Sequence, residues 1–216
     1  MAGLPGGTVT FLFTDVEGST RLWEADPEAM SRALARHDEL LRTAIEDAGG
    51  YVFATAGDAF CAAFEDPDAA VGAAVRIQQE LVAEDWGATP IRVRAALCSG
   101  RPEQRDGDYF GPVLNRTARL LNTGHGGQVL VSDTTKALLT GGDWGLVDLG
   151  EHRLRDLTSC EHVFQLQIPG LPAEFPPIRS LGAYVHNLPA QFTSFVGRAD
   201  ETAMITKLLA DDRTMS

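Results

Sequence analysis

The order in which strand-like and helix-like segments follow one another constrains the fold of this chain most strongly. In the first helical segment, Leu34, Leu41 and Ile45 recur at spacings that place them on one face. After it come two strands separated only by a short turn that contains a glycine, which is a hairpin signal. The segments in question are strands 8–14, 51–54, 59–64 and 91–99 and helices 32–48 and 66–81. Their succession, β-α-β-β-α-β, predicts an α+β fold with a ferredoxin-like core and appended elements.

The remaining segments predict one domain, a linker and a short end piece. The polar run 100–108 indicates a loop or protruding arm, and shorter patterns predict helices 113–121 and 133–139 and strands 129–131, 146–149 and 163–166. Prolines become frequent after Ile168, where the periodicity ends. We therefore expect a domain over 1–168, a proline-rich linker over 169–194, and over 195–216 the start of a further domain or a C-terminal tail.

Composition limits the classes of partner. A formal net charge of −12 argues against direct binding of nucleic acid, which needs a basic patch. No apolar run approaches the ~18 residues that cross a bilayer, and no signal-peptide pattern opens the chain. The three cysteines are scattered, as is typical of reduced thiols. We expect a soluble cytoplasmic protein with no membrane contact, in which His37, beside Asp38 in the first helix, lies at the surface.

Two aspartates occupy positions where an apolar strand breaks into a turn that contains a glycine. Asp15 follows the strand 8–14 and precedes Gly18, and Asp58 follows Gly57 in the predicted hairpin. Carboxylates are hard oxygen ligands that suit Mg²⁺, which often binds one or two of them together with substrate phosphates. If the two strand ends meet, the pair predicts a two-metal site for phosphoryl chemistry.

A second group of polar residues surrounds the predicted helix 113–121. Asn115 and Arg119 are four positions apart, so their side chains lie one turn apart on the same helix face. An amide and a guanidinium placed in this way suit contact with a ribose and with the charge of a transferring phosphoryl group. Asp108 precedes them in the segment Gly107-Asp108-Tyr109-Phe110-Gly111.

Taken together, these segments resemble the catalytic domain of class III adenylyl and guanylyl cyclases. The resemblance covers roughly residues 7–167 and rests on three motifs in their order and spacing: the Asp15 to Thr20 segment, the Gly57-Asp58 hairpin, and the run Asp108-x-x-Gly-x-x-x-Asn115-x-x-x-Arg119.

The resemblance implies a role for each matching position. Asp15 and Asp58, helped by the backbone carbonyl of Val16, would hold two Mg²⁺ or Mn²⁺ ions. Asp108 would read the base, Asn115 would orient the ribose and Arg119 would stabilise the transition state.

The resemblance also implies an assembly and a reaction. In this family the site forms between two protomers, so a homodimer would carry two equivalent sites. The ribose 3′-oxygen of a nucleoside triphosphate would attack the α-phosphorus and release pyrophosphate. The backbone amides at a helix N-terminus would receive the β- and γ-phosphates; the residues concerned are Glu17, Gly18, Ser19 and Thr20.

One departure from the family affects the choice of base. Where adenylyl cyclases of this family carry a base-reading lysine, three residues before the hairpin glycine, this chain has Ala54. Alanine offers no hydrogen-bond donor, so discrimination and activity should be low. Because Asp108 could accept from the adenine amino group, ATP is the favoured substrate and GTP the rival. Arg153 and Arg155 are both candidates for the cation that binds pyrophosphate.

Two interpretations of function therefore stay open at this point. The first is a homodimeric cyclase that makes cyclic AMP. The second is a degenerate domain that binds nucleotide or only dimerises, and regulates an attached module. The segment 187–198 resembles the entry to the ATPase domain of large bacterial transcriptional regulators of the signal-transduction ATPase type, which suggests such a module.

Overall fold

The computed structural model describes residues 4–142 and 144–181. Residues 195–216, predicted as a further domain or tail, lie outside the described residues, as do residues 182–194 of the predicted linker. The elements are, in chain order, β1 (Val9–Val16), α1 (Ser19–Ala25), α2 (Pro27–Asp47), β2 (Tyr51–Ala56), β3 (Ala59–Phe64), α3 (Pro67–Ala83), β4 (Val93–Gly100), β5 (Glu103–Arg105), β6 (Asp108–Phe110), α4 (Pro112–Leu121), β7 (Val129–Ser132), α5 (Asp133–Lys136), β8 (Leu146–His152) and β9 (Glu161–Leu166).

Seven of the strands form one mixed sheet in the order β2-β3-β1-β4-β7-β9-β8. Strand β1 pairs antiparallel with both β3 and β4. Because α1 and α2 connect β1 to β2, and α3 connects β3 to β4, these four strands form the ferredoxin-like core. The sheet then continues through β7, which is parallel to β4, and through β9 and β8, which are antiparallel to their neighbours. The predicted α+β fold class is confirmed.

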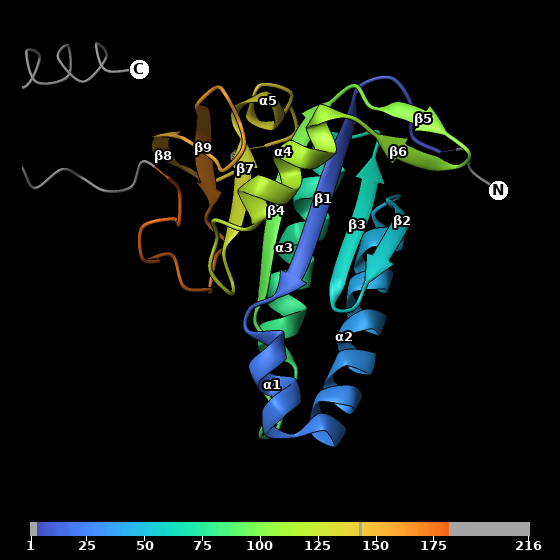
Figure 1. Cartoon of the computed structure of the whole chain (residues 1–216), viewed down its shortest axis with the longest axis vertical. Helices are drawn as coiled ribbons and strands as arrows, with labels where there is room; N and C mark the ends of the chain where they lie inside the picture. Colours follow the sequence, from blue (N-terminus) through green and yellow to red (C-terminus); the bar gives the residue numbers. More distant parts are fainter. Residues whose placement is uncertain (1–3, 143, 182–216) are drawn as a thin grey trace, which may run out of the picture. The chain divides into compact units, whose positions relative to one another are not determined.

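The two faces of the sheet are covered by different elements. Strand side chains alternate between faces, so Leu12 and Val16 of β1 pack on one side, with α2 and α3. Phe11 and Phe13 pack on the other side, with residues of α4 and β6. In Figure 1, α4 crosses in front of the sheet while α3 lies behind it. By the same alternation, Asp15 belongs to the α4 face.

Local structure departs from the sequence predictions in several places: α1 was not predicted as a separate helix, and β8 extends to His152 instead of ending at residue 149. Helix α2 begins five residues early, at Pro27, because the Asp26 side chain accepts a hydrogen bond from the Ala29 amide at 2.9 Å and caps the helix. The polar run 100–108 contains β5 and the start of β6, which pair as an antiparallel hairpin with Asp106 and Gly107 at positive φ in its turn. Helix α5 ends at Lys136, three residues before the predicted end.

His37 is fully buried, so the expected surface position is wrong. Its ring lies edge-on to that of Phe60, with 5.8 Å between the ring centroids, and Nδ1 is 2.9 Å from a carboxylate oxygen of Asp38. Helical periodicity explains the burial, because His37 lies on the same side of α2 as Ala33, Leu40 and Leu41. Burial lowers the pKa of His37, although the neighbouring Asp38 opposes that shift.

The first half of the predicted linker lies against the domain. Gln165 of β9 donates a side-chain hydrogen bond to the carbonyl of Ala173 at 2.7 Å, and Ile178 is 3% exposed. Within residues 4–142 and 144–181, no helix has the length and the apolar content that crossing a membrane requires.

Candidate functional site

Asp15 lies one residue before the end of β1 and forms a two-point ion pair with Arg94 of β4. Arg94 Nε donates to Asp15 Oδ1 at 2.7 Å, and Nη2 donates to Oδ2. The two residues are direct partners in the antiparallel register, so strand pairing sets them opposite each other. Their side chains are only 20% and 15% exposed, respectively. The carboxylate is therefore held at the strand end by a matched cation.

Asp58 reaches the same strand end from the turn of the β2–β3 hairpin. Its Oδ2 accepts a hydrogen bond from the Val16 amide at 2.7 Å. Gly57, with φ at 62°, gives the tight turn that presents Asp58. Because Val16 directly follows Asp15, the structure brings the two aspartates together although 42 residues separate Val16 from Asp58.

The turn after Asp15 forms only part of the predicted phosphate-binding segment. Gly18, with φ at 72°, is the N-cap of α1, and no side chain caps that helix. Ser19 and Thr20 form its first turn, where amides lack an acceptor within the helix. The Glu17 amide was expected to face phosphates, but it donates to the Arg92 carbonyl at 2.9 Å and so extends the β1–β4 pairing. That expectation is wrong for the Glu17 amide.

The side chain of Glu17 is held by a residue far along the chain. Arg179 Nη2 donates to Glu17 Oε1 at 2.8 Å. Burial would raise the pKa of Glu17, but the hydrogen bonds from Arg179 and from the Gly126 amide outweigh it and lower the pKa overall. Gly126 permits this close approach, because a Cβ atom there would lie 2.8 Å from Glu17 Oε2. The Glu17 carboxylate is thus held by hydrogen bonds within the chain.

The two predicted base-reading positions lie close to each other. Ala54 of β2 pairs with Cys61 of β3. Burial raises the pKa of the Cys61 thiol to about 11, and the charge of Asp108 at the start of β6 adds to that shift. Next to these residues, the rings of Phe53 and Tyr109 pack with 5.0 Å between centroids. The β5–β6 hairpin therefore brings Asp108 to the edge strand that carries Ala54.

Helix α4 carries the remaining predicted pair. Asn115 is exposed, and Arg119, one turn later, is 40% exposed and donates from Nη2 to Asp156 at 2.8 Å. Past the end of the helix, the Arg119 side chain borders a hollow of about 500 Å³. Its lining residues are Arg119, Asn122, Thr123, Arg155, Arg179 and Leu181. Of the two candidate cations for pyrophosphate, Arg155 lines this hollow and Arg153 does not.

The predicted site residues thus form two separate groups within one chain. Asp15, Val16 and Asp58 meet at the end of β1, whereas Asn115 and Arg119 lie on α4. Among the described residues, no hydrogen bond or ion pair links an aspartate of the first group to Asn115 or Arg119.

The chemistry of the first group fits a divalent cation. Among residues 4–142 and 144–181, no cluster of three or more histidine, cysteine or acidic side chains is found. A magnesium site needs only one or two carboxylates when substrate phosphates complete its shell. Asp15 is a largely buried carboxylate that already binds a cation, the Arg94 guanidinium. Metal binding at Asp15 would therefore involve exchange of one cation for another.

Two residues near the site were missed by the sequence reasoning. Arg94 lies in an otherwise apolar strand, and its charge at such a position was the available signal. Arg179 lies in the proline-rich segment, where no periodicity points to a site. The contact partner of each is remote in sequence, by 79 residues for Asp15 and Arg94 and by 162 for Glu17 and Arg179.

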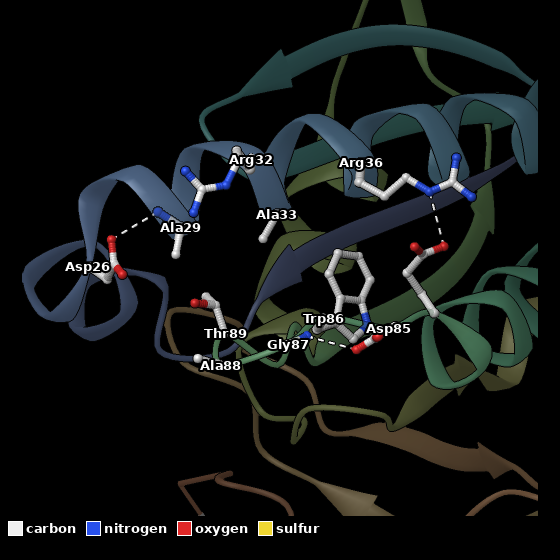
Figure 2. A pocket seen from close by; sticks show the side chains of 11 residues that line it. Asp26, Ala29, Arg32, Ala33, Arg36, Asp85, Trp86, Gly87, Ala88 and Thr89 are labelled. Atoms are coloured by element: carbon white, nitrogen blue, oxygen red, sulfur yellow. Dashed lines mark hydrogen bonds and ion pairs between the residues drawn. The ribbon is translucent and has the colours of Figure 1, made fainter.

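A second hollow, of about 470 Å³, lies between the first half of α2 and the segment 84–89 (Figure 2). It contains none of the predicted site residues. Its charges are of both signs: Arg32 and Arg36 face Asp26, Glu84 and Asp85. Arg36 donates to Glu84 at 3.0 Å, and Asp26 caps α2. These contacts are structural and do not indicate a ligand.

The amino-acid sequence of this chain is similar to those of known proteins. A family model described as the adenylate and guanylate cyclase catalytic domain matches residues 4–85. An uncharacterised protein of Mycobacterium tuberculosis is 45% identical over 200 residues, which cover 90% of this chain and 68% of that protein.

Solved structures match both the fold and the sequence. An adenylate cyclase of Trypanosoma brucei, analysed in its monomeric state, is 30% identical with a TM-score of 0.75, and the match covers 82% of this chain and 96% of that one. An adenylate/guanylate cyclase/hydrolase of Silicibacter pomeroyi is also 30% identical, with a TM-score of 0.66 and coverage of 76% and 98%. The likeness spans almost all of each solved chain.

Proposed function

Because this chain belongs to the class III adenylyl and guanylyl cyclase family, we propose that it is an adenylyl cyclase that converts ATP to cyclic AMP and pyrophosphate. The observation that supports this most is the hydrogen bond from the Val16 amide to Asp58, which brings a second carboxylate beside Asp15 at the end of β1. Two carboxylates at one strand end suit metal-assisted phosphoryl chemistry.

Asp15 and Asp58, with the carbonyl of Val16, would hold two Mg²⁺ or Mn²⁺ ions. Bound there, such ions lower the pKa of the attacking ribose hydroxyl and offset phosphate charge. Arg94, released from Asp15, would be free to donate to the phosphates from the same face of the sheet. The amides of Gly18, Ser19 and Thr20 would add donors at the start of α1.

A second copy of the chain would complete each site. Asn115 of one protomer would orient the ribose of a nucleotide held by the aspartates of its partner. Arg119 would stabilise charge on the phosphoryl group as the bond to pyrophosphate breaks. The separation of the two groups within one chain supports this arrangement, and a two-fold axis would create two equivalent sites.

Base selection would fall mainly to Asp108. Its carboxylate can accept from the adenine amino group, while Ala54 beside it gives no donor to a purine ring nitrogen. A lost donor weakens discrimination, so we expect low activity and incomplete rejection of GTP.

We place this activity in the cytoplasm. The supporting observation is that all three cysteines, which lie among the described residues, are free thiols, as is typical of proteins from a reducing compartment.

The test measures cyclic product from ATP and, separately, from GTP, with Mn²⁺ over a range of protein concentrations. Asp15→Ala should lower product from ATP by at least about a hundredfold, because a metal ligand is lost. Asp47→Ala is the matched control: this exposed carboxylate at the end of α2 pairs with Arg76, and its loss should leave the rate unchanged.

Two further readouts decide the rest of the proposal. Specific activity that rises with protein concentration supports a site shared between two chains. Equal product from the parent and Asp15→Ala, with both proteins folded, would contradict the metal assignment. Product from GTP alone would contradict ATP as the substrate.

A further inference from the structure

The segment 171–181 is hydrogen-bonded to a residue just past α4, to the last residue of β8 and to the loop that follows β8. The Arg179 amide donates to the Thr123 carbonyl at 2.9 Å, just past the end of α4. The Leu181 amide donates to the Arg153 carbonyl at 2.9 Å, in the loop after β8. Between them, the Ser180 hydroxyl lies 2.8 Å from His152 Nδ1. These contacts hold residues 179–181 against the domain.

A buried side chain adds to this attachment. Ile178 is 3% exposed and packs in the apolar cluster on the α4 face of the sheet. Burial of such an apolar side chain stabilises the docked state. The backbone of the next residue, Arg179, is therefore anchored by the burial of Ile178 and by its own hydrogen bond to Thr123.

The Arg179 side chain lies between Glu17 and the hollow beside Arg119. Nη2 contacts Glu17 Oε1 at 2.8 Å and His125 Nδ1 at 3.2 Å. The side chain is 51% exposed and lines the 500 Å³ hollow. A guanidinium has five N–H groups, so a contact through one amino group leaves donors for a second acceptor.

The charge of this hollow suits an anion. Three guanidinium groups line it, and no acidic side chain among residues 4–142 and 144–181 does. Asp156 pairs with Arg119 at 2.8 Å but is not among the lining residues. The hollow in Figure 2, in contrast, has three acidic residues against two arginines. On a chain of net charge −12, a hollow whose charged lining residues are all cations among the described residues is a local exception.

We propose that Arg179, from the segment after the last strand, joins Arg119 and Arg155 to bind the terminal phosphates of the nucleotide. Without nucleotide, the Arg179 guanidinium pairs with Glu17. When a nucleotide binds, its phosphates compete with Glu17 for the guanidinium. This inference rests on the proposed cyclase function for its ligand. It adds a phosphate-binding residue from outside the α4 and β1 motifs.

Inorganic pyrophosphate is the probe, titrated by calorimetry into the full chain in metal-free buffer at low salt. Arg179→Gln should weaken binding by about tenfold, the factor expected from the loss of one charge-assisted hydrogen bond. Arg179→Lys should recover part of that loss. Arg32→Gln, which removes the same charge from the hollow in Figure 2, should change binding less than about twofold.

Glu17→Gln separates phosphate binding from a purely structural role. If Arg179 binds phosphate, loss of its competitor should leave pyrophosphate affinity unchanged or higher. If Arg179 serves only to hold the turn that contains Glu17, both Glu17→Gln and Arg179→Gln should weaken binding alike, which would overturn the proposal. Equal effects of Arg179→Gln and Arg32→Gln would overturn it as well, since they would reflect net charge alone.

Failure of the proposed function can be distinguished from failure of this inference. A parent protein that makes no cyclic product would contradict the cyclase proposal, yet its pyrophosphate titration would still test Arg179. Circular dichroism and elution volume of each variant show whether it is folded. A folded Arg179→Gln with parental pyrophosphate affinity would refute the role of Arg179 whatever the cyclase assay gives.

Discussion

Arg94 places a positive charge where the proposed reaction needs a divalent cation. Its two-point contact with Asp15 is largely buried, so neither group can lose its partner cheaply. A metal ion that binds Asp15 would displace the Arg94 guanidinium. The displaced guanidinium could then donate hydrogen bonds to the phosphates of a bound triphosphate. The ion pair would in this way favour joint binding of metal and nucleotide over binding of metal alone.

In the absence of nucleotide, Mn²⁺ would compete with Arg94 for the Asp15 carboxylate. Arg94→Gln should raise the affinity for Mn²⁺ several-fold, because the ion no longer competes with a guanidinium for Asp15. Loss of free Mn²⁺ signal in electron paramagnetic resonance measures this directly. Arg92→Gln, two residues earlier, is the control and should change the affinity less than about twofold. A folded Arg94→Gln with weaker Mn²⁺ binding would mean that Arg94 supports the metal site instead of competing for it.

At the scale of elements, helix α2 carries an ionisable group into the core. Helical spacing places His37 among apolar neighbours against Phe60, where a charged imidazole would lose its hydration. The folded protein therefore binds a proton at His37 less readily than the unfolded chain does. The stability associated with neutral His37 is complete above the ordinary pKa of about 6.5 and is lost as the pH falls below it.

Removal of this histidine should reduce the loss of unfolding free energy as the pH falls. His37→Leu keeps an apolar side chain of similar size in α2, and the difference in unfolding free energy between this variant and the parent should grow as the pH falls from 7 to 5. Urea unfolding at each pH measures it. His162, whose pKa is raised by a hydrogen bond to Asp148, is common to both proteins and cancels in the difference. A constant difference across this range would contradict the assignment.

The proposed cyclase site would need a second copy of the chain, because its two groups of residues lie apart within one chain. Asp58 and Arg119 belong to different groups, so a variant that lacks one retains the other. In a mixed dimer of the two variants, one site would lack both residues and the other would be intact.

Mixing Asp58→Ala with Arg119→Ala should therefore restore activity to two inactive proteins. A purified mixed dimer has one intact site of two, so its product should reach about half of the parental rate. The measurement is cyclic AMP formed after the differently tagged variants have been mixed and purified through both tags. A purified mixed dimer without activity would count against a site shared between chains.

Local sequence patterns determined the core of the fold. Strand alternation, helical spacing and the Gly57 turn fixed β1 to β4 and their helices, since these depend on contacts between near neighbours. The run 100–108 was predicted as a loop or protruding arm, but its strands β5 and β6 were not predicted, because strands of three residues carry too little periodicity. The prediction for His37 was wrong because it relied on the polar residue type and on the neighbouring Asp38. It did not use the position of His37 on the apolar face of the helix.

Residue types and spacing by themselves identified Asp15, Asp58, Asp108, Asn115 and Arg119 as candidates, because their chemistry and intervals are local properties of the chain. Only the tertiary structure decided which of these residues lie together and which charged side chains pair with them. Arg94 faces Asp15 through strand pairing, and Arg179 reaches Glu17 because Ile178 is buried. Contacts between residues 79 and 162 positions apart depend on how sheets and segments pack. No local pattern encodes that packing.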